Sequence, residues 1–312
     1  MKQALAPLLL ALPIVACVAC GRSKPQGARV DPMTVVTVPA KDAGGVICVS
    51  DPSFPPSLEV PEASAAAEVE LKKGARELLV VSDSGRKGQA LAYALPDGPS
   101  RPLRLPLDPA VNDDTEGMAW LRGHLYVLVS LGYVERFTAT PAGELVRDGP
   151  AYALGAPPYV SVNVKDPPSE KPPDFEGLCL RSSPSPASRC VGYAASRAYG
   201  WLVCLIFDGD HLKVDPVRPR LALDVKKHAL SDCAFGAAGG PAEGVLLVTT
   251  NIRGGSTVSR VDEETGALTP IDVEGTLNNE AIAVDRDGRL YQLADAQQGG
   301  TSPSVRASCA GW

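Results

Sequence analysis

The chain has 312 residues and a formal net charge of −6, so it offers no excess of basic side chains to a nucleic acid backbone. Its 30 glycines and 29 prolines are too many for a chain built of long helices, and they are typical of short strands joined by turns. Composition therefore argues against nucleic acid as a partner and favours an all-β fold.

The first 17 residues have the layout of a secretory signal peptide. A basic residue precedes an almost wholly apolar stretch, residues 4–16, which is too short for a dependable membrane span. Residues 14–17 (Ile-Val-Ala-Cys) resemble a lipobox, in which small residues precede a cysteine that is lipid-modified after cleavage. We expect lipidation at Cys17 and hence a membrane partner through the lipid, with Cys20 as a second candidate and plain secretion as the alternative.

Residues 18–45 are rich in proline, lysine, glycine and alanine and carry few large apolar side chains. Such a composition predicts a solvated tether. A folded domain is expected over residues 46–312, a normal length for a single barrel or propeller. The expected location is the cell envelope, at the outer membrane or the periplasmic face, with an extracellular position left open, and the expected state is a monomer.

Cysteine usage points to disulfides rather than to a metal cluster. Apart from the two N-terminal cysteines, six of the eight lie in the expected domain, with no C-x-x-C pair among them and only three histidines in the chain. We expect Cys48, at the start of the domain, to pair with Cys309, near its end, if the two terminal strands share one sheet. Cys179 with Cys190, which flank a Ser/Pro-rich turn, is the next expected pair.

A strand-turn-strand unit recurs at a spacing typical of propeller blades. Each copy starts with a short apolar strand that carries an acidic or amide residue, and a strongly β-prone strand follows after a turn. The copies cover residues 66–83, 113–130, 174–196, 230–251 and 278–295. No long segment has a helical period with caps. The sequence therefore predicts an all-β fold, a β-propeller of about five blades of antiparallel strands, with six left open.

Four motifs carry a family resemblance: DDTEGMAW with HLYVLVSLG, DFEGLCL, LSDCAF and NNEAIAVDRDGRLYQLAD. At these residues the chain resembles the esterase-like phytase group, its uncharacterised relatives and, more distantly, gluconolactonase-like propellers. The resemblance spans nearly the whole mature chain and implies a propeller with metal-dependent hydrolysis as its activity. The many calcium and phosphate ligands of phytases are not matched residue by residue. Of the lactonase metal ligands, only the glutamate carries over, onto Glu116, Glu176 and Glu280.

Four acidic residues fall at matching points of the repeat: Glu116, Glu176, Asp232 and Glu280. Because the first strand of a propeller blade lines the channel, we expect their side chains to converge, where they would repel unless a cation or a proton compensates. Hard oxygen ligands suit Ca²⁺ or Mg²⁺ better than zinc, so we predict a metal site with Ca²⁺ as the cofactor. The alternatives are a catalytic acid or base, and acids that hydrogen-bond the neighbouring blade while Gly117 and Gly177 allow close packing.

The ends of the second strands are expected to form a ligand-binding ring near the acids: Asp83, Ser130, Arg197, Asn251 and Asp295. Arg197 is the one cation expected there, either as a bidentate anion ligand or as a counter-charge. No G-x-S-x-G occurs, which argues against a serine hydrolase. Two functions remain open: a divalent-metal-dependent hydrolase of phosphoesters or lactones and esters, and a non-catalytic propeller that binds a small anionic ligand or an envelope protein. The sequence leaves undecided whether the protein is an enzyme.

Overall fold

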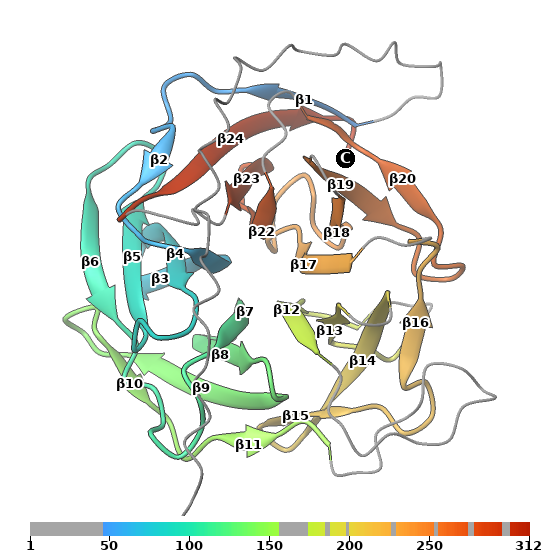
Figure 1. The fold of residues 1–312 in the computed structure, drawn as a ribbon, viewed down its shortest axis with the longest axis horizontal. Helices are drawn as coiled ribbons and strands as arrows, with labels where there is room; N and C mark the ends of the chain where they lie inside the picture. Colours follow the sequence, from blue (N-terminus) through green and yellow to red (C-terminus); the bar gives the residue numbers. More distant parts are fainter. Residues whose placement is uncertain are drawn as a thin grey trace, which may run out of the picture. The chain divides into compact units, whose positions relative to one another are not determined.

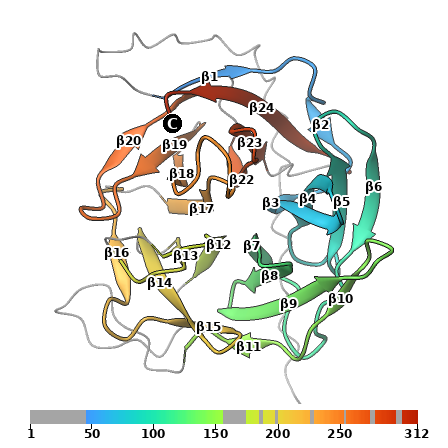
Figure 2. The same ribbon diagram turned by 180° about the vertical axis from the view of Figure 1, so that it is seen from behind.

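A computed structural model describes residues 46–155, 174–184, 188–197, 200–225, 229–252, 255–273, 278–294 and 300–312. The expected signal peptide with Cys17 and Cys20, the expected tether and Asp295 lie outside these residues. Over the described ranges the regular elements are all β-strands, and they form five sheets around a central axis (Figures 1 and 2). The prediction of a five-bladed β-propeller is confirmed. No helix with the length and apolar character of a membrane span is found in the described part of the chain.

Four blades take their strands in chain order from the axis outward. Blade 1 consists of β3 (Ala63–Lys72), β4 (Ala75–Ser82), β5 (Gln89–Ala94) and β6 (Ser100–Arg104). Blade 2 consists of β7 (Thr115–Leu121), β8 (His124–Val129), β9 (Tyr133–Ala139) and β10 (Leu145–Arg147), with β11 (Tyr152–Ala153) beside β9. Blade 3 consists of β12 (Phe175–Leu180), β13 (Gly192–Ser196), β14 (Trp201–Asp208) and β15 (His211–Val214), with β16 (Arg220–Ala222) beside β14. Blade 4 consists of β17 (Ala229–Phe235), β18 (Leu246–Ile252), β19 (Gly255–Val261) and β20 (Leu268–Pro270).

Blade 5 joins the two ends of the described chain and so closes the ring (Figure 1). It combines β22 (Asn279–Val284), β23 (Arg289–Ala294) and β24 (Ser302–Ala310) with β1 (Ile47–Ser50), β2 (Ser57–Leu58) and β21 (Asp272–Val273). Strand β1 runs antiparallel to β24, and Cys48 lies directly opposite Cys309. These two cysteines form a disulfide, which is the pairing expected from the sequence.

The expected pair Cys179–Cys190 is wrong. Cys179 instead bonds Cys233 of β17, and Cys190 bonds Cys204 of β14. The reason is strand register: Cys179 lies opposite Tyr193 on β13, whereas Cys190 precedes that strand and falls past the end of β12. Cys179–Cys233 therefore links the first strands of blades 3 and 4, and Cys190–Cys204 lies within blade 3.

The apolar core lies between blades. In the described residues, five buried clusters each join two adjacent blades. For example, Leu79 of blade 1 packs in one cluster with Leu125 and Phe137 of blade 2. Because second strands are covered on both sides, they have continuous apolar runs such as Leu78-Leu79-Val80-Val81, all fully buried. Burying one such leucine stabilises the fold by about 1.5–3 kcal/mol.

A tight hairpin turn joins the first two strands of blade 2. Between β7 and β8 the two turn residues, Arg122 and Gly123, both have positive φ, at 54° and 80°. This is the backbone of a type I′ turn, whose twist matches that of the flanking strands. The five first strands β3, β7, β12, β17 and β22 lie nearest the axis, one in each blade (Figure 1).

Candidate functional site

Each first strand carries a β-bulge near its start, at one end of the channel. The register shift leaves one residue per described first strand unpaired: Ser64, Glu116, Glu176, Ser231 and Glu280. A bulge re-aims the side chain of its extra residue. Glu116, Glu176 and Glu280 therefore do share one structural position, and blades 1 and 4 have serine there.

Asp232 does not belong to this set, which corrects the sequence prediction. It follows the bulge residue Ser231 and occupies the position of Gly177 in blade 3. Its carboxylate accepts backbone hydrogen bonds from Cys233 and from Ile282 of blade 5, both at 2.7 Å. Burial raises the pKa of Asp232, which is 2 % exposed. Asp232 thus joins blades 4 and 5, as the alternative interpretation expected.

Glycines keep the channel wall tight beside these acids. A Cβ at Gly177 would lie 2.6 Å from Asp232 Oδ1, and one at Gly117 would lie 2.2 Å from Leu178 N. Such approaches are possible only without a side chain. The close-packing role expected for both glycines is therefore present.

A cavity of about 110 Å³ lies at this end of the channel and is called here the channel mouth. The residues that line it are Glu62, Ala63, Ser64, Asp83, Glu116, Glu176, Arg197 and Glu280. Asp83 and Arg197, predicted as ligand-binding, are thus brought together with Glu116, Glu176 and Glu280, predicted as metal ligands.

Three carboxylates form the tightest group at the channel mouth. One oxygen from each of Asp83, Asp114 and Glu116 lies within 4.8 Å of the other two, so this acidic cluster can hold a metal ion. Asp114 also accepts a hydrogen bond of 2.5 Å from the Ser130 hydroxyl, which fixes its orientation. Sequence reasoning missed Asp114, although its signal was present two residues before Glu116 in the motif Asp-Asp-Thr-Glu-Gly.

Glu176 lies next to this cluster and is only 4 % exposed in its side chain. Its Oε2 bonds Arg197 Nη2 at 2.8 Å. Its Oε1 is buried and has no hydrogen-bond partner among the described residues. Burial raises the pKa of Glu176, while Arg197 opposes that shift. Burial is the main cause that raises the pKa of Glu116, and the nearby carboxylates of Glu176 and Asp114 raise it further. Buried carboxylates this close together need a cation or a proton to compensate their negative charge.

Glu280 is supported by amides. Asn251 Nδ2 donates to Glu280 Oε1 at 2.9 Å, and Asn278 Nδ2 donates to the same oxygen at 3.4 Å. Asn251 is in turn held by the Ser256 hydroxyl, which donates to its Oδ1 at 2.5 Å. The structure therefore gives Asn251, predicted as ligand-binding, the local task of orienting Glu280.

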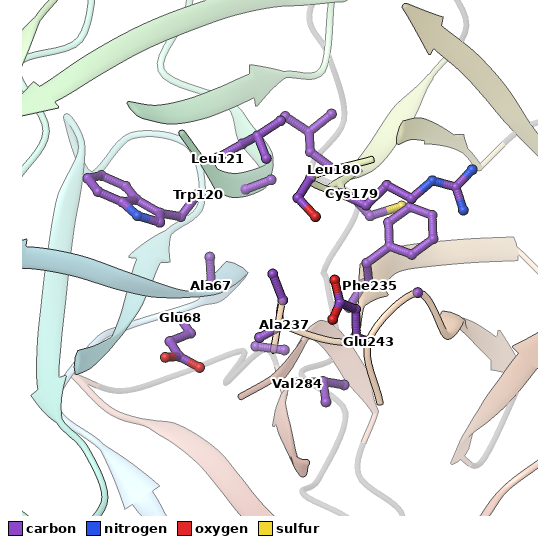
Figure 3. A pocket seen from close by; sticks show the side chains of 18 of the residues that line it. Ala67, Glu68, Trp120, Leu121, Cys179, Leu180, Phe235, Ala237, Glu243 and Val284 are labelled. Atoms are coloured by element: carbon purple, nitrogen blue, oxygen red, sulfur yellow. The ribbon is translucent and has the colours of Figure 1, made fainter. Parts of the chain in front are cut away.

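A larger cavity of about 590 Å³ lies at the opposite end of the channel (Figure 3). It is lined by apolar side chains such as Leu121, Leu180 and Phe235, together with acids and arginines. Its largely buried acids are already paired: Glu68 with Arg76 at 2.6 Å, and Glu263 with Arg181 at 2.5 Å. This cavity is larger than the channel mouth, but the Glu176 oxygen without a partner among the described residues and the acidic cluster favour the channel mouth as the functional site.

Comparison with known proteins places the fold. No protein-family model matches the chain, and no curated protein matches it. Among solved structures, a glutaminyl cyclase from Myxococcus xanthus is 16% identical with a TM-score of 0.50, over 86% of this chain and 100% of that one. A virginiamycin B lyase from Staphylococcus aureus is 13% identical, over 76% of this chain and 64% of that one, with a TM-score of 0.39. The β-propeller domain of Cps50 (Swd1) from Myceliophteria thermophila is 12% identical, over 73% of this chain and 65% of that one, with a TM-score of 0.37. At these identities the likeness concerns the fold alone.

Proposed function

We propose that the channel mouth binds a divalent cation, with Ca²⁺ preferred, through Asp83, Asp114 and Glu116, and with Glu176 as the fourth ligand. The observation that carries the proposal is the buried Glu176 Oε1, which lacks a partner among the described residues beside three convergent carboxylates. A cation would satisfy that oxygen and cancel the repulsion among the acids. Carboxylate oxygens are the ligands that Ca²⁺ takes in proteins.

The proposed activity is divalent-metal-dependent hydrolysis of a phosphoester, or of a lactone or other ester. A cation held by Asp83, Asp114, Glu116 and Glu176 would polarise a phosphoryl or carbonyl oxygen and would make a nearby water more acidic. In the reaction a water oxygen bonds to phosphorus or to the carbonyl carbon, the P–O or acyl C–O bond to the alcohol oxygen breaks, and that oxygen takes up a proton; in a lactone the freed hydroxyl stays in the same molecule. Glu280, held in place by Asn251, is suited to accept the proton of the attacking water. The family resemblance of the motifs around Glu116 and Glu176 supports the same class of reaction.

A second function, non-catalytic binding, is favoured by the size of the cavity. About 110 Å³ holds an ion with a few waters, whereas ligand pockets usually measure about 300–1,000 Å³. A small anionic ligand or an envelope protein would then lie over the blade face and contact the cation from above. In this alternative the protein binds Ca²⁺ and its ligand but releases no product.

The disulfides suggest an exported, non-cytoplasmic protein. Attachment to the cell envelope through a lipid on Cys17 is part of the proposal. Mass spectrometry of the mature N-terminal peptide tests it, since a diacyl-modified cysteine at position 17 supports the anchor and an unmodified peptide contradicts it.

The proposed function is tested by calorimetric titration of the purified protein with Ca²⁺, comparing wild type with the double variant Glu116→Gln, Glu176→Gln. The double variant is expected to fold and to lose Ca²⁺ binding, because each substitution removes one charged ligand while keeping side-chain size. Hydrolysis of p-nitrophenyl phosphate and p-nitrophenyl acetate, with and without Ca²⁺, then separates the enzyme from the binding protein. Equal Ca²⁺ binding by both proteins would overturn the cation site.

A further inference from the structure

The ion pair between Arg197 and Glu176 lies at the rim of the channel mouth. Arg197 directly follows β13, and its backbone amide donates to Asp174 O at 2.8 Å, which fixes its backbone. Its side chain is 46 % exposed, whereas that of Glu176 is 4 % exposed. The guanidinium is therefore half in solvent and half engaged with a buried acid. Among the described residues that line the cavity, Arg197 is the one cationic side chain.

Arg197 and a bound cation would compete for the same carboxylate. Glu176 uses Oε2 for Arg197 and leaves Oε1 without a partner in the described structure. A divalent ion on Oε1 would place two further positive charges within a few ångströms of the guanidinium. Because Arg197 is half exposed and Glu176 is buried, the arginine is the partner able to move toward solvent.

We infer that cation binding releases Arg197 from Glu176 and that the released guanidinium then binds the anionic group of the substrate, so that cation and anion bind cooperatively. This inference rests on the proposed cation site. It selects a phosphomonoester or a similar anion as the ligand class, because a guanidinium fork matches phosphate oxygens in a bidentate manner. A neutral lactone offers no ionic partner for the released arginine.

Thermodynamic linkage requires that Ca²⁺ and the anion change each other's affinity equally. If Ca²⁺ raises the affinity for an anion by some factor, the anion must raise the affinity for Ca²⁺ by the same factor. An anion that contacts only the ion would also show coupling, so the part carried by Arg197 has to be isolated by substitution. Removing Arg197 should strengthen binding of Ca²⁺ alone, because Glu176 no longer has a competing partner, and it should weaken anion binding.

The test is calorimetry with phenylphosphonate, a phosphomonoester analogue that cannot be hydrolysed, at zero and saturating Ca²⁺, on wild type and Arg197→Gln. In wild type we expect Ca²⁺ to tighten phenylphosphonate binding about tenfold or more. In Arg197→Gln we expect several-fold tighter Ca²⁺ binding without phenylphosphonate, and a loss of most of the coupling. Arg197→Lys, which keeps the charge but not the fork, should retain part of it.

Arg286→Gln is the matched control. Arg286 is 49 % exposed and lies 4.0 Å from the buried acid Glu68, at the opposite end of the channel. This variant should leave both affinities unchanged. If Arg197→Gln binds phenylphosphonate as wild type does in Ca²⁺, the inference is overturned while the cation site stands. If wild type binds no Ca²⁺, the inference and the proposed function both fail.

Discussion

The residue at the bulge of the first strand has one of two roles in each described blade. In blades 1 and 4 this residue is serine, and the hydroxyls of Ser64 and Ser231 donate to carbonyl oxygens of the next blade at 2.5 and 2.8 Å. In blades 2, 3 and 5 it is glutamate, whose longer acidic side chain reaches the mouth. The same bulge therefore links adjacent blades where its residue is serine, and it supplies a carboxylate to the channel mouth where its residue is glutamate.

Asp232 and Glu116 should respond oppositely to neutral substitution. Asp232→Asn leaves a side-chain NH₂ group facing the backbone N–H of Cys233 or Ile282, which loses one buried hydrogen bond. We expect it to lower the free energy of unfolding by about 1–3 kcal/mol and to leave Ca²⁺ binding intact. Glu116→Gln removes like-charge repulsion, so the Ca²⁺-free protein should unfold at the same urea concentration or higher. If the Asp232→Asn variant were as stable as wild type but no longer bound Ca²⁺, this prediction would be contradicted and Asp232 would be a metal ligand.

The residues of the site were only partly predictable. Glu116 and Glu176 stand in a repeated Glu-Gly motif, so their shared position could be read from the sequence. Blade 4 has Leu-Ser-Asp-Cys instead, and nothing in a single sequence shows that the bulge falls on Ser231 rather than on Asp232. Arg197 was expected near the acids, as a counter-charge or as an anion ligand, but the sequence did not show which acid it pairs with.

At the scale of elements, three disulfides within the described chain hold strands at different sequence separations: 261 residues for Cys48–Cys309, 54 for Cys179–Cys233 and 14 for Cys190–Cys204. The first pair was predictable because a closed ring must bring its terminal strands together. The other two were not, because Cys179 finds its partner in the next blade while a nearer cysteine lies close in sequence.

Removing the disulfides by paired Cys→Ala substitution should destabilise the protein in the order of loop length. In the chain-entropy model the loss of stability is about 3 kcal/mol for the short loop and about 4–6 kcal/mol for the longer ones, because long loops gain most freedom when unfolded. Urea unfolding of the three double variants measures the order. The largest loss for Cys190–Cys204 would contradict the view that cross-links act mainly by restraining the unfolded chain.

At the scale of the whole propeller, ring closure depends on Arg306 as well as on β1 and β24. Arg306 is 2 % exposed, and its Nη2 bonds Asp51 at 2.5 Å and Asp97 at 2.7 Å. Its guanidinium also lies 5.1 Å from the ring centre of Phe54. The buried Arg306 side chain thus links β24 to the segment after β1 and to blade 1, where the first and last strands of the propeller meet.

Low pH should weaken the ion pair between Arg306 and Asp51 and so lower the stability of the protein. Hydrogen bonds from Ser53, and then Arg306, lower the pKa of Asp51 to about 2. A depressed folded-state pKa means that the contribution to stability is present above the unfolded value of 3.8 and is lost as pH falls through about 2. Wild type should therefore lose stability between about pH 4 and pH 2, and Asp51→Asn should lose less over this interval. Urea unfolding at several pH values measures both, and identical losses would contradict the role of Asp51.

A crystal structure of the protein grown with Ca²⁺ tests the proposed cation site at the channel mouth most directly. We predict one ion bound by oxygens of Asp83, Asp114, Glu116 and Glu176 at about 2.3–2.6 Å, with Arg197 no longer paired with Glu176. A structure at saturating Ca²⁺ with no ion at the channel mouth, and with Arg197 still on Glu176, would contradict it.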